Sequence, residues 1–123
     1  MLGSYSLIAF VATANPEVAK KFYGETLGLR FVSQDPFALV FDAGGTMLRV
    51  AVVREHQPAG YTVLGWSVPN IAAAVRELSG RGVVFERFQG MQQDASGIWQ
   101  SPSGAQVAWF KDPEGNILSL TQF

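Results

Sequence analysis

Apolar and polar positions in the first half of the chain change period in a way that predicts a strand, a helix and three further strands. The apolar run SLIAFVAT, residues 6–13, has the length and composition of a strand. In ANPEVAKKFYGETLGL, residues 14–29, Val18, Phe22 and Leu29 fall near helical spacing. Three strand-like runs rich in Phe and Val follow: RFVSQ (30–34), FALVFD (37–42) and TMLRVAVV (46–53).

Residues with strong positional preferences mark the ends of these elements. Asn15 is a good N-cap, and Pro16 fits the first helical position because its missing N–H would have no partner there. Gly28 suits the left-handed conformation in which many helices end. AGG, residues 43–45, predicts a tight hairpin turn. The first half of the chain therefore predicts the order βαβββ.

The same order recurs after a polar connector, REHQPAGY, residues 54–61. TVLGWSV predicts a strand, PNIAAAVRELSGRG a helix and VVFERF, residues 83–88, a second strand. AQVAWF and ILSLTQ then predict the closing hairpin, with KDPEGN as its turn. An insertion, QGMQQDASGIWQSPSG at residues 89–104, occurs only in this second copy.

Each unit is too small to close a core alone, so the two are expected to pair. The predicted fold class is α+β, with two βαβββ repeats forming one curved mixed sheet, a concave cavity inside and helices outside. We expect a single domain over residues 1–123, with repeats at about 5–54 and 61–123. The cavity is the expected place for a ligand.

Composition narrows the choice of partners. With 48% hydrophobic and 15% charged residues the chain is globular, and a net charge of -1 with scattered Lys and Arg argues against nucleic acid. The absence of cysteine excludes disulfides, thiolate metal sites and a cysteine nucleophile. The N-terminal stretch has neither a basic leader nor a run long enough to cross a bilayer, so we expect a cytoplasmic protein without membrane association.

Two segments at opposite ends of the chain carry a family resemblance. NPEVAKKFYGETLGL and FKDPEGNILSL look like the first helix and the final hairpin of the vicinal oxygen chelate superfamily, which includes glyoxalase I, extradiol dioxygenases and proteins that confer resistance to fosfomycin or bleomycin. The resemblance covers nearly the whole chain. We interpret DPEGN as a turn, because Pro113 presets one corner and Gly115 supplies a positive φ.

The resemblance implies where a metal site would lie, namely on the first and last strands of each repeat. By motif spacing those positions are Ile8, Arg49, Val63 and Ser119. Apolar side chains donate no lone pair, a guanidinium repels a divalent ion, and a lone hydroxyl is a poor ligand. The only histidine, His56, is interpreted as a solvated connector residue. We therefore expect no metal and no other cofactor.

Strand alternation indicates which side chains would face a ligand. The inward positions include Ile8, Phe10, Met47, Arg49, Ala51, Val63, Ile117 and Ser119. The opposite face, expected to pack under the helices, carries Leu7, Val11, Leu48, Val50, Leu64, Trp66, Leu118 and Leu120. The insertion adds Met91, Trp99 and Gln100, and Trp109 precedes the final turn. The candidate ligand-binding residues are Ile8, Phe10, Met47, Arg49, Val63, Trp99, Trp109 and Ser119.

This composition of the cavity wall favours metal-independent binding of a small, largely apolar or aromatic molecule. Arg49 would suit an anionic group, although it could instead pair with an acidic neighbour or reach solvent. Such a protein would resemble the bleomycin-resistance type of sequestering protein. The alternatives are a lyase or oxidoreductase of glyoxalase or dioxygenase type with an unforeseen metal site, and a protein-association module. Trp99 could belong to a lid or to a homodimer interface, and the resemblance implies a homodimer.

Overall fold

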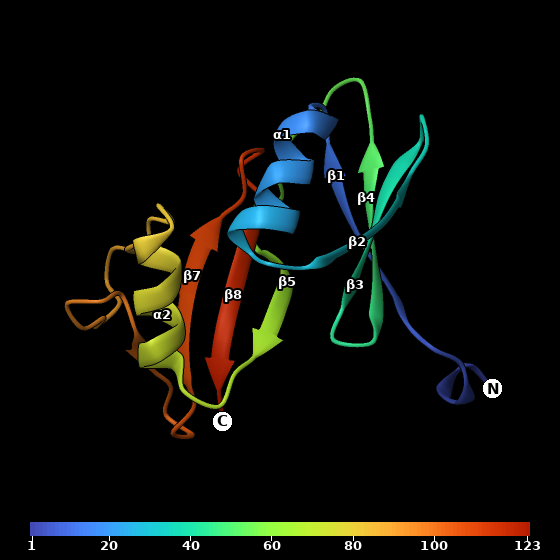
Figure 1. Ribbon diagram of the computed structural model, residues 1–123. Coiled ribbons are helices and arrows are strands. Elements are labelled where there is room, and N and C mark those ends of the chain that lie inside the picture. The colour runs from blue at the N-terminus through green and yellow to red at the C-terminus, as the bar shows by residue number, and fades with distance from the viewer. The chain divides into compact units, whose positions relative to one another are not determined.

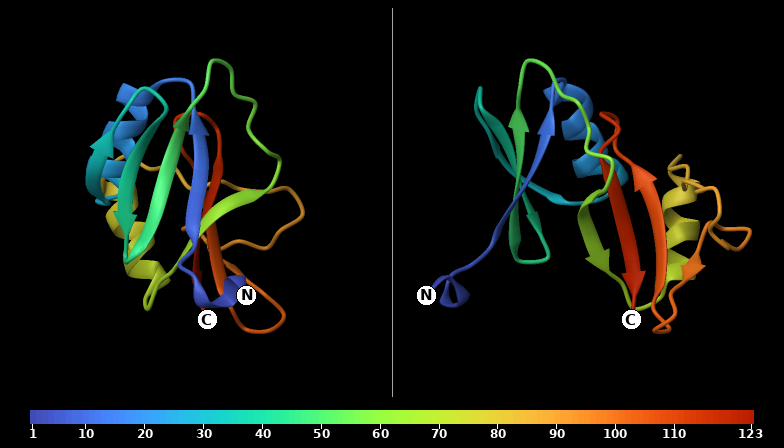
Figure 2. Two further views of the ribbon diagram at one scale, coloured as in Figure 1. Left: turned by 90° about the vertical axis from the view of Figure 1, so that its right-hand side faces the viewer. Right: turned by 180° about the vertical axis from the view of Figure 1, so that it is seen from behind.

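The structure is a computed structural model that describes residues 1–123. The chain divides into two compact units, Met1–Gln57 and Pro58–Phe123, each of which is described by itself. Each unit contains one four-stranded sheet and one α-helix that lies against a single face of that sheet (Figures 1 and 2). No helix is long and apolar enough to cross a bilayer.

The first unit begins with a short 3₁₀ turn, Leu2–Ser4, and then follows the predicted order. Its remaining elements are β1 (Ile8–Thr13), α1 (Pro16–Lys21), a π-helical turn η2 (Phe22–Thr26), β2 (Arg30–Gln34), β3 (Ala38–Ala43) and β4 (Thr46–Val52). The sheet order is β1-β4-β3-β2. Strands β1 and β4 pair in parallel, and the other neighbours are antiparallel.

The second unit repeats this arrangement. Its elements are β5 (Thr62–Ser67), α2 (Ile71–Gly80), β6 (Trp99–Gln100), β7 (Gln106–Lys111) and β8 (Ile117–Gln122), and the sheet order is β5-β8-β7-β6. Strands β5 and β8 are again the parallel pair. Two four-stranded mixed sheets of the same topology confirm the α+β class with two βαβββ repeats, whereas curvature and a concave cavity stay predictions.

The two helices begin where the sequence places their caps. The Asn15 side chain accepts a hydrogen bond from the Val18 amide at 3.4 Å, and Asn70 accepts one from the Ala73 amide at 3.0 Å. Such bonds satisfy backbone donors that have no partner inside the helix. Gly28 follows the helical segment formed by α1 and η2, and its φ of 74° is the left-handed conformation expected just after a helix end.

The expected strand at residues 83–88 does not form. Only Phe85 makes an isolated bridge, to Phe110, and the edge position of the sheet is taken instead by β6 from the insertion. The prediction of a strand was therefore wrong for this segment.

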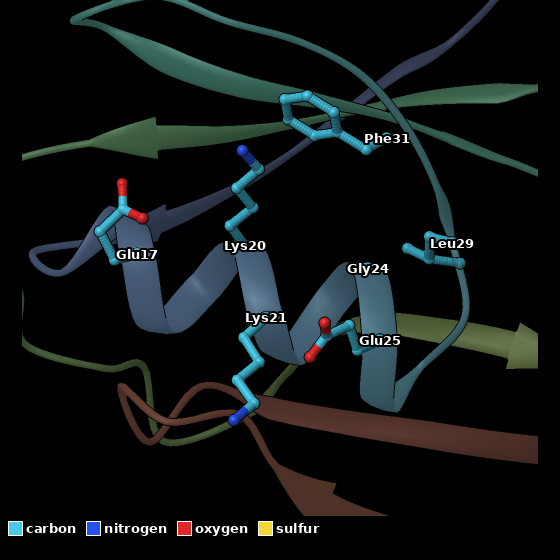
Figure 3. A pocket seen from close by; sticks show the side chains of 7 residues that line it. All are labelled: Glu17, Lys20, Lys21, Gly24, Glu25, Leu29 and Phe31. Atoms are coloured by element: carbon cyan, nitrogen blue, oxygen red, sulfur yellow. The ribbon is translucent and has the colours of Figure 1, made fainter.

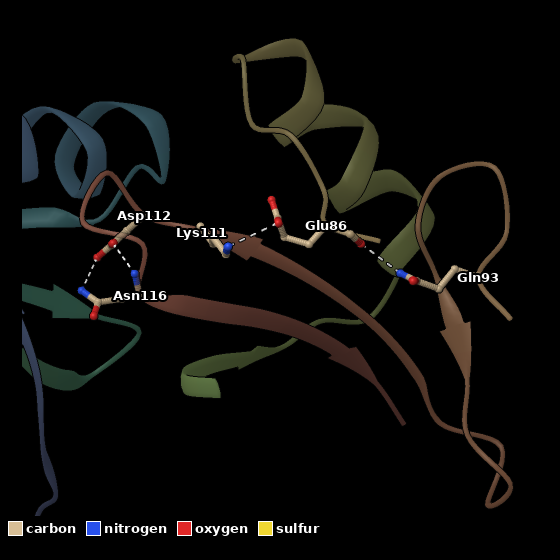
Figure 4. A network of polar contacts seen from close by, with 5 residues as sticks. All are labelled: Glu86, Gln93, Lys111, Asp112 and Asn116. Carbon is tan, nitrogen blue, oxygen red and sulfur yellow. Dashed lines mark hydrogen bonds and ion pairs between the residues drawn. The ribbon is translucent and has the colours of Figure 1, made fainter. Parts of the chain in front are cut away.

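A single side chain explains why the segment leaves the ladder. The Gln93 amide nitrogen donates to the carbonyl of Glu86 at 3.0 Å (Figure 4) and to that of Gly97 at 2.7 Å, while its oxygen accepts from the Phe88 amide at 2.8 Å. Backbone groups that a strand partner would have satisfied are thus paired with Gln93. We call this three-bond arrangement the Gln93 clip.

The core of each unit lies between its sheet and its helix. In the first unit it contains Val11, Tyr23, Leu39, Phe41, Leu48 and Val50, all nearly inaccessible to solvent. The corresponding residues of the second unit are Ile71, Val75, Ala108, Phe110, Leu118 and Leu120. The prediction that Leu7 packs under the helix is wrong. Leu7 is 76% exposed, because β1 begins only at Ile8.

The DPEGN segment is the turn that its residues predict. One Asp112 oxygen accepts hydrogen bonds from the amides of Glu114 and Asn116, both at 2.9 Å, and the other accepts from the Asn116 side chain at 2.8 Å (Figure 4). Gly115 has a φ of 85°. Because the polar side chains bond within their own turn, Asp112 and Asn116 can be buried at little cost.

The Gln93 clip yields a direct test. Gln93→Glu keeps the size of the side chain but replaces both N–H donors with a carboxylate that faces two carbonyls. We expect the variant to lose about 1–3 kcal/mol in the free energy of unfolding, measured by urea denaturation. Gln92→Glu, at the exposed neighbouring position, is the matched control and should unfold like wild type. Equal stability of the two variants would show that the clip does not hold the insertion.

Candidate functional site

The sheet of the first unit has one face under α1 and one face open. Across the parallel pair, Ile8 lies beside Met47 and Phe10 beside Arg49, so these four side chains share the open face. Ile8 is 45%, Phe10 61% and Met47 41% exposed, whereas Val11, Leu48 and Val50 on the other face are buried. The structure thus brings together all four candidate residues that lie in this unit, as an apolar surface with one cation.

Arg49 lies near a carboxylate without forming a salt bridge. The Asp35 carboxylate accepts hydrogen bonds from the amides of Phe37 at 2.7 Å and Ala38 at 3.0 Å. These bonds hold the pKa of Asp35 below its usual value; desolvation opposes them, and the charge of Arg49 makes the smallest contribution to the lowering. The other carboxylate near this surface, Asp42, pairs with Arg30 at 3.7 Å. The guanidinium of Arg49 therefore forms no salt bridge with either carboxylate.

The open face of the second unit is aromatic instead. Trp109 lies beside Ser119 across the β7–β8 pair, and Trp99 is opposite Val107 across the β6–β7 pair. The Trp99 and Trp109 ring centroids are 6.0 Å apart, and the Phe88 ring meets Trp109 edge-on at 5.4 Å. Edge-on and tilted contacts at these distances are the favourable arrangements of aromatic rings. Trp66 lies on the opposite face, stacked on Phe110.

A shallow hollow of about 200 Å³ adjoins this aromatic cluster. Its lining residues are Gly60, Tyr61, Thr62, Phe88, Met91, Trp109 and Ile117. None of them carries a charge. Phe88 and Thr62 were not among the candidates from the sequence, and the one signal for Phe88 was its position directly before the glycine-flanked insertion.

Val63 does not occupy the position that spacing gave it. Ile8 pairs with Met47 in the first unit. By motif spacing, Val63 and Ile117 are the equivalent residues of the second unit, so these two were expected to pair. The register of β5 shifts between Thr62 and Leu64, so Thr62 pairs with Ile117 and Val63 falls in the irregularity. Counting back from the helix cap cannot detect such a shift.

The donor set on these faces does not fit a catalytic metal ion. The open-face residues of the parallel strand pairs are Ile8, Phe10, Met47, Arg49, Thr62, Gly65, Ile117 and Ser119. They include no histidine or carboxylate, and a fixed cation would repel a divalent ion. No three His, Cys, Asp or Glu residues are grouped so that they could hold a metal ion.

The first unit also has a hollow of about 640 Å³ on its helix side (Figure 3). It is lined by Glu17, Lys20, Lys21, Gly24, Glu25, Leu29 and Phe31. Lys20 points toward Phe31, with its amine 4.5 Å from the ring centroid, while Lys21 points away. Two lysines and two glutamates balance in charge, so this surface selects no particular ligand.

Comparison with known proteins places the chain among proteins of the predicted fold. A family model described as Glyoxalase/Bleomycin resistance protein/Dioxygenase superfamily matches residues 6–120. No curated protein matches.

Solved structures match along their whole length. A member of the same superfamily from Sphaerobacter thermophilus DSM 20745 is 25% identical, with full coverage of both chains and a TM-score of 0.77. A glyoxalase family protein from Enterococcus faecalis is 19% identical over 98% of this chain and 99% of its own, with a TM-score of 0.76. A lactoylglutathione lyase from Agrobacterium tumefaciens is also 19% identical, over 97% and 93%, with a TM-score of 0.66.

The close approach of β5 and β8 at the open face can be tested by substitution. A Cβ atom added at Gly65 would lie 2.7 Å from the Ser119 hydroxyl oxygen, which would have to leave its rotamer. We expect Gly65→Ala to lower the free energy of unfolding by about 1 kcal/mol. Adding Ser119→Ala should restore part of that loss, as measured by a double-mutant cycle in urea. Purely additive effects would show that Ser119 does not restrict this position.

Proposed function

The chain belongs to the Glyoxalase/Bleomycin resistance protein/Dioxygenase superfamily, and from that membership we propose that it binds a small aromatic organic molecule without a metal ion. The observation that carries the proposal is the cluster of Trp109, Trp99 and Phe88 on the open face of the second sheet. Aromatic side chains grouped beside a hollow favour a flat apolar ligand, because ring contacts add about 0.5–1.5 kcal/mol beyond the burial of area.

The lining of the hollow suits this class of ligand. Met91 adds a polarisable thioether that adapts to ligand shape, and Tyr61 and Thr62 supply hydroxyl groups for one or two hydrogen bonds. A hollow with no charged lining residue gives little binding energy to a strongly polar molecule. We therefore infer a ligand whose ring system contacts Trp109 and whose polar substituents are few.

Binding without turnover follows from the chemistry of the side chains. The open faces offer Arg49, Ser119 and Thr62 but no histidine, and the carboxylates nearest to Arg49 are engaged by backbone amides (Asp35) or by Arg30 (Asp42). A metal-assisted reaction would need donors that these strands do not carry. The similarity to a lactoylglutathione lyase, at 19% identity, concerns the fold alone.

We also propose that the open face of the first unit by itself binds an aromatic acid, with Arg49 recognising the acidic group. Arg49 is the only charged residue of the β1–β4 open face, and Phe10 and Met47 surround it with apolar surface. A guanidinium in such surroundings binds carboxylates with two parallel hydrogen bonds. A homodimer stays a prediction; the exposed apolar side chains Tyr5, Leu7 and Phe37 are compatible with it.

The aromatic part of the proposal is tested with 1-naphthol and chelator-treated protein. We expect saturable binding, weakened about tenfold or more by Trp109→Leu, since one lost ring contact with its buried area corresponds to roughly 1.4 kcal/mol. Trp66→Leu is the control, because that ring lies on the helix side, and it should bind like wild type. Adding zinc, nickel, manganese or ferrous iron should change nothing. Binding that requires a metal, or that survives Trp109→Leu intact, would overturn the proposal.

Recognition of an acid is tested by comparing 1-naphthoate with 1-naphthol. Arg49→Gln should weaken naphthoate binding at the open face of the first unit by about tenfold, while leaving naphthol binding at the aromatic cluster of the second unit unchanged. Arg54→Gln removes the same charge from the exposed connector and serves as the matched control. An equal loss in both variants would indicate a general effect of net charge, and Arg49 would have no specific role.

A further inference from the structure

The second unit contains four basic residues, and they fall into two classes. Arg81 pairs with Glu77 at 3.0 Å and Lys111 pairs with Glu86 at 3.6 Å (Figure 4). The remaining two, Arg76 and Arg87, form no salt bridge with a carboxylate.

Both unpaired arginines line one groove of about 460 Å³. Its residues come from α2, from the segment after it and from the insertion: Val75, Arg76, Ser79, Val83, Val84, Phe85, Arg87, Ala95 and Ser96. We call this surface the α2 groove. No acidic residue lines it, so the groove carries two positive charges that nothing within it neutralises. It also lies on the helix side of the sheet, away from the open face that carries Trp109.

The one acidic residue of the insertion, Asp94, uses its carboxylate to bind backbone amides of the insertion itself. One Asp94 carboxylate oxygen accepts hydrogen bonds from the amides of Ser96 at 2.8 Å and Ile98 at 2.9 Å. Arg87 donates to the backbone carbonyl of Asp94 instead of to its carboxylate. This bond restrains the guanidinium at the wall of the groove, where it forms no salt bridge with a carboxylate. The Gln93 clip holds the same stretch of backbone in place.

The rest of the groove is apolar. Val75 and Val83 are buried at its base, whereas Val84 is 76% exposed. An exposed valine in the same groove as the two arginines can contact a hydrocarbon group, and Ser79 and Ser96 add hydroxyls. The combination of two cations, hydroxyls and one exposed apolar side chain is complementary to a molecule with an acidic end and a short apolar end.

We propose that the α2 groove is a second binding site, which takes a small organic anion. Arg76 and Arg87 hold the carboxylate or phosphate monoester group, and the hydrocarbon part of the ligand lies on Val84. Guanidinium groups suit both acids, because their planar donors match the spacing of the acid oxygens. The site is independent of the aromatic cluster on the open face.

The experiment is a titration of nitrogen-15-labelled protein with hexyl phosphate, followed by nuclear magnetic resonance. The expected result is saturable movement of the Arg76 and Arg87 side-chain signals and of the Val84 amide signal. Arg76→Gln and Arg87→Gln should each weaken binding by about fivefold or more. Arg81→Gln removes an equal charge from the end of the same helix, where Glu77 already pairs with it, and should change the affinity by less than about twofold. A loss as large in Arg81→Gln, or signal changes outside the groove alone, would overturn the site.

Three further probes separate the parts of the ligand. Hexanoate should bind at the same residues, inorganic phosphate more weakly than hexyl phosphate, and 1-hexanol not at all. Val84→Ser should weaken hexyl phosphate but leave inorganic phosphate unchanged. Equal affinity for hexanol would refute recognition of the anion, and equal affinity for inorganic phosphate would refute the apolar contact. Arg76, Arg87 and Val84 are exposed, so the variants should fold, which the amide spectrum of each one checks directly.

The two proposed sites can be tested independently, because each has a variant that should leave the other site unchanged. Trp109→Leu should leave the affinity for hexyl phosphate unchanged, and Arg87→Gln should leave the affinity for 1-naphthol unchanged. If Trp109→Leu weakened hexyl phosphate binding as strongly as Arg87→Gln, the probe would be reading the open face and the α2 groove would not be a site.

Discussion

The parallel pairing of the first and last strands in each unit determines the role of nearly every other side chain. Parallel strands need a long crossover between them, and here α1 or α2 with the intervening strands supplies it. Once the pairing register is set, alternate residues are committed to the helix side or to the open face, and a shift by one residue would exchange the two sets. This register explains why Leu48 and Val50 are buried while Met47, which points to the other face, is exposed.

This constraint explains how far the sequence could be interpreted. Asn15, Asn70 and Gly28 act locally, through their own hydrogen bonds or φ angles, so the helix ends were predictable from single residues. The alternation that separates Met47 from Leu48 was predictable for the same reason. The shift at Val63 was not, because it depends on how β5 meets β8, which no nearby residue indicates. The strand expected at 83–88 failed because Gln93, beyond its end, competes for its backbone groups.

The aromatic character of the candidate site could be predicted from the sequence, but the hollow beside it could not. Its aromatic residues were recognisable because a tryptophan such as Trp99 is conspicuous on a polar, glycine-flanked segment. The hollow beside them could not be derived, since Phe88 joins Trp109 only after the segment before the insertion has left the sheet. The α2 groove could not be predicted from the sequence either. It depends on which arginines form salt bridges, and that is decided by side-chain geometry. Charge counts along a chain cannot distinguish a paired Arg81 from an unpaired Arg76.

The Gln93 clip has a consequence for how this protein could diversify. Three hydrogen bonds from one side chain hold the backbone on either side of the exposed residues Asp94, Ala95 and Ser96. These three residues could change in number or chemistry while Trp99 and Gln100 keep their pairing with β7. Because the insertion contributes Trp99 to one side of the sheet and Ser96 to the other, changes in this one segment could alter both proposed sites at once.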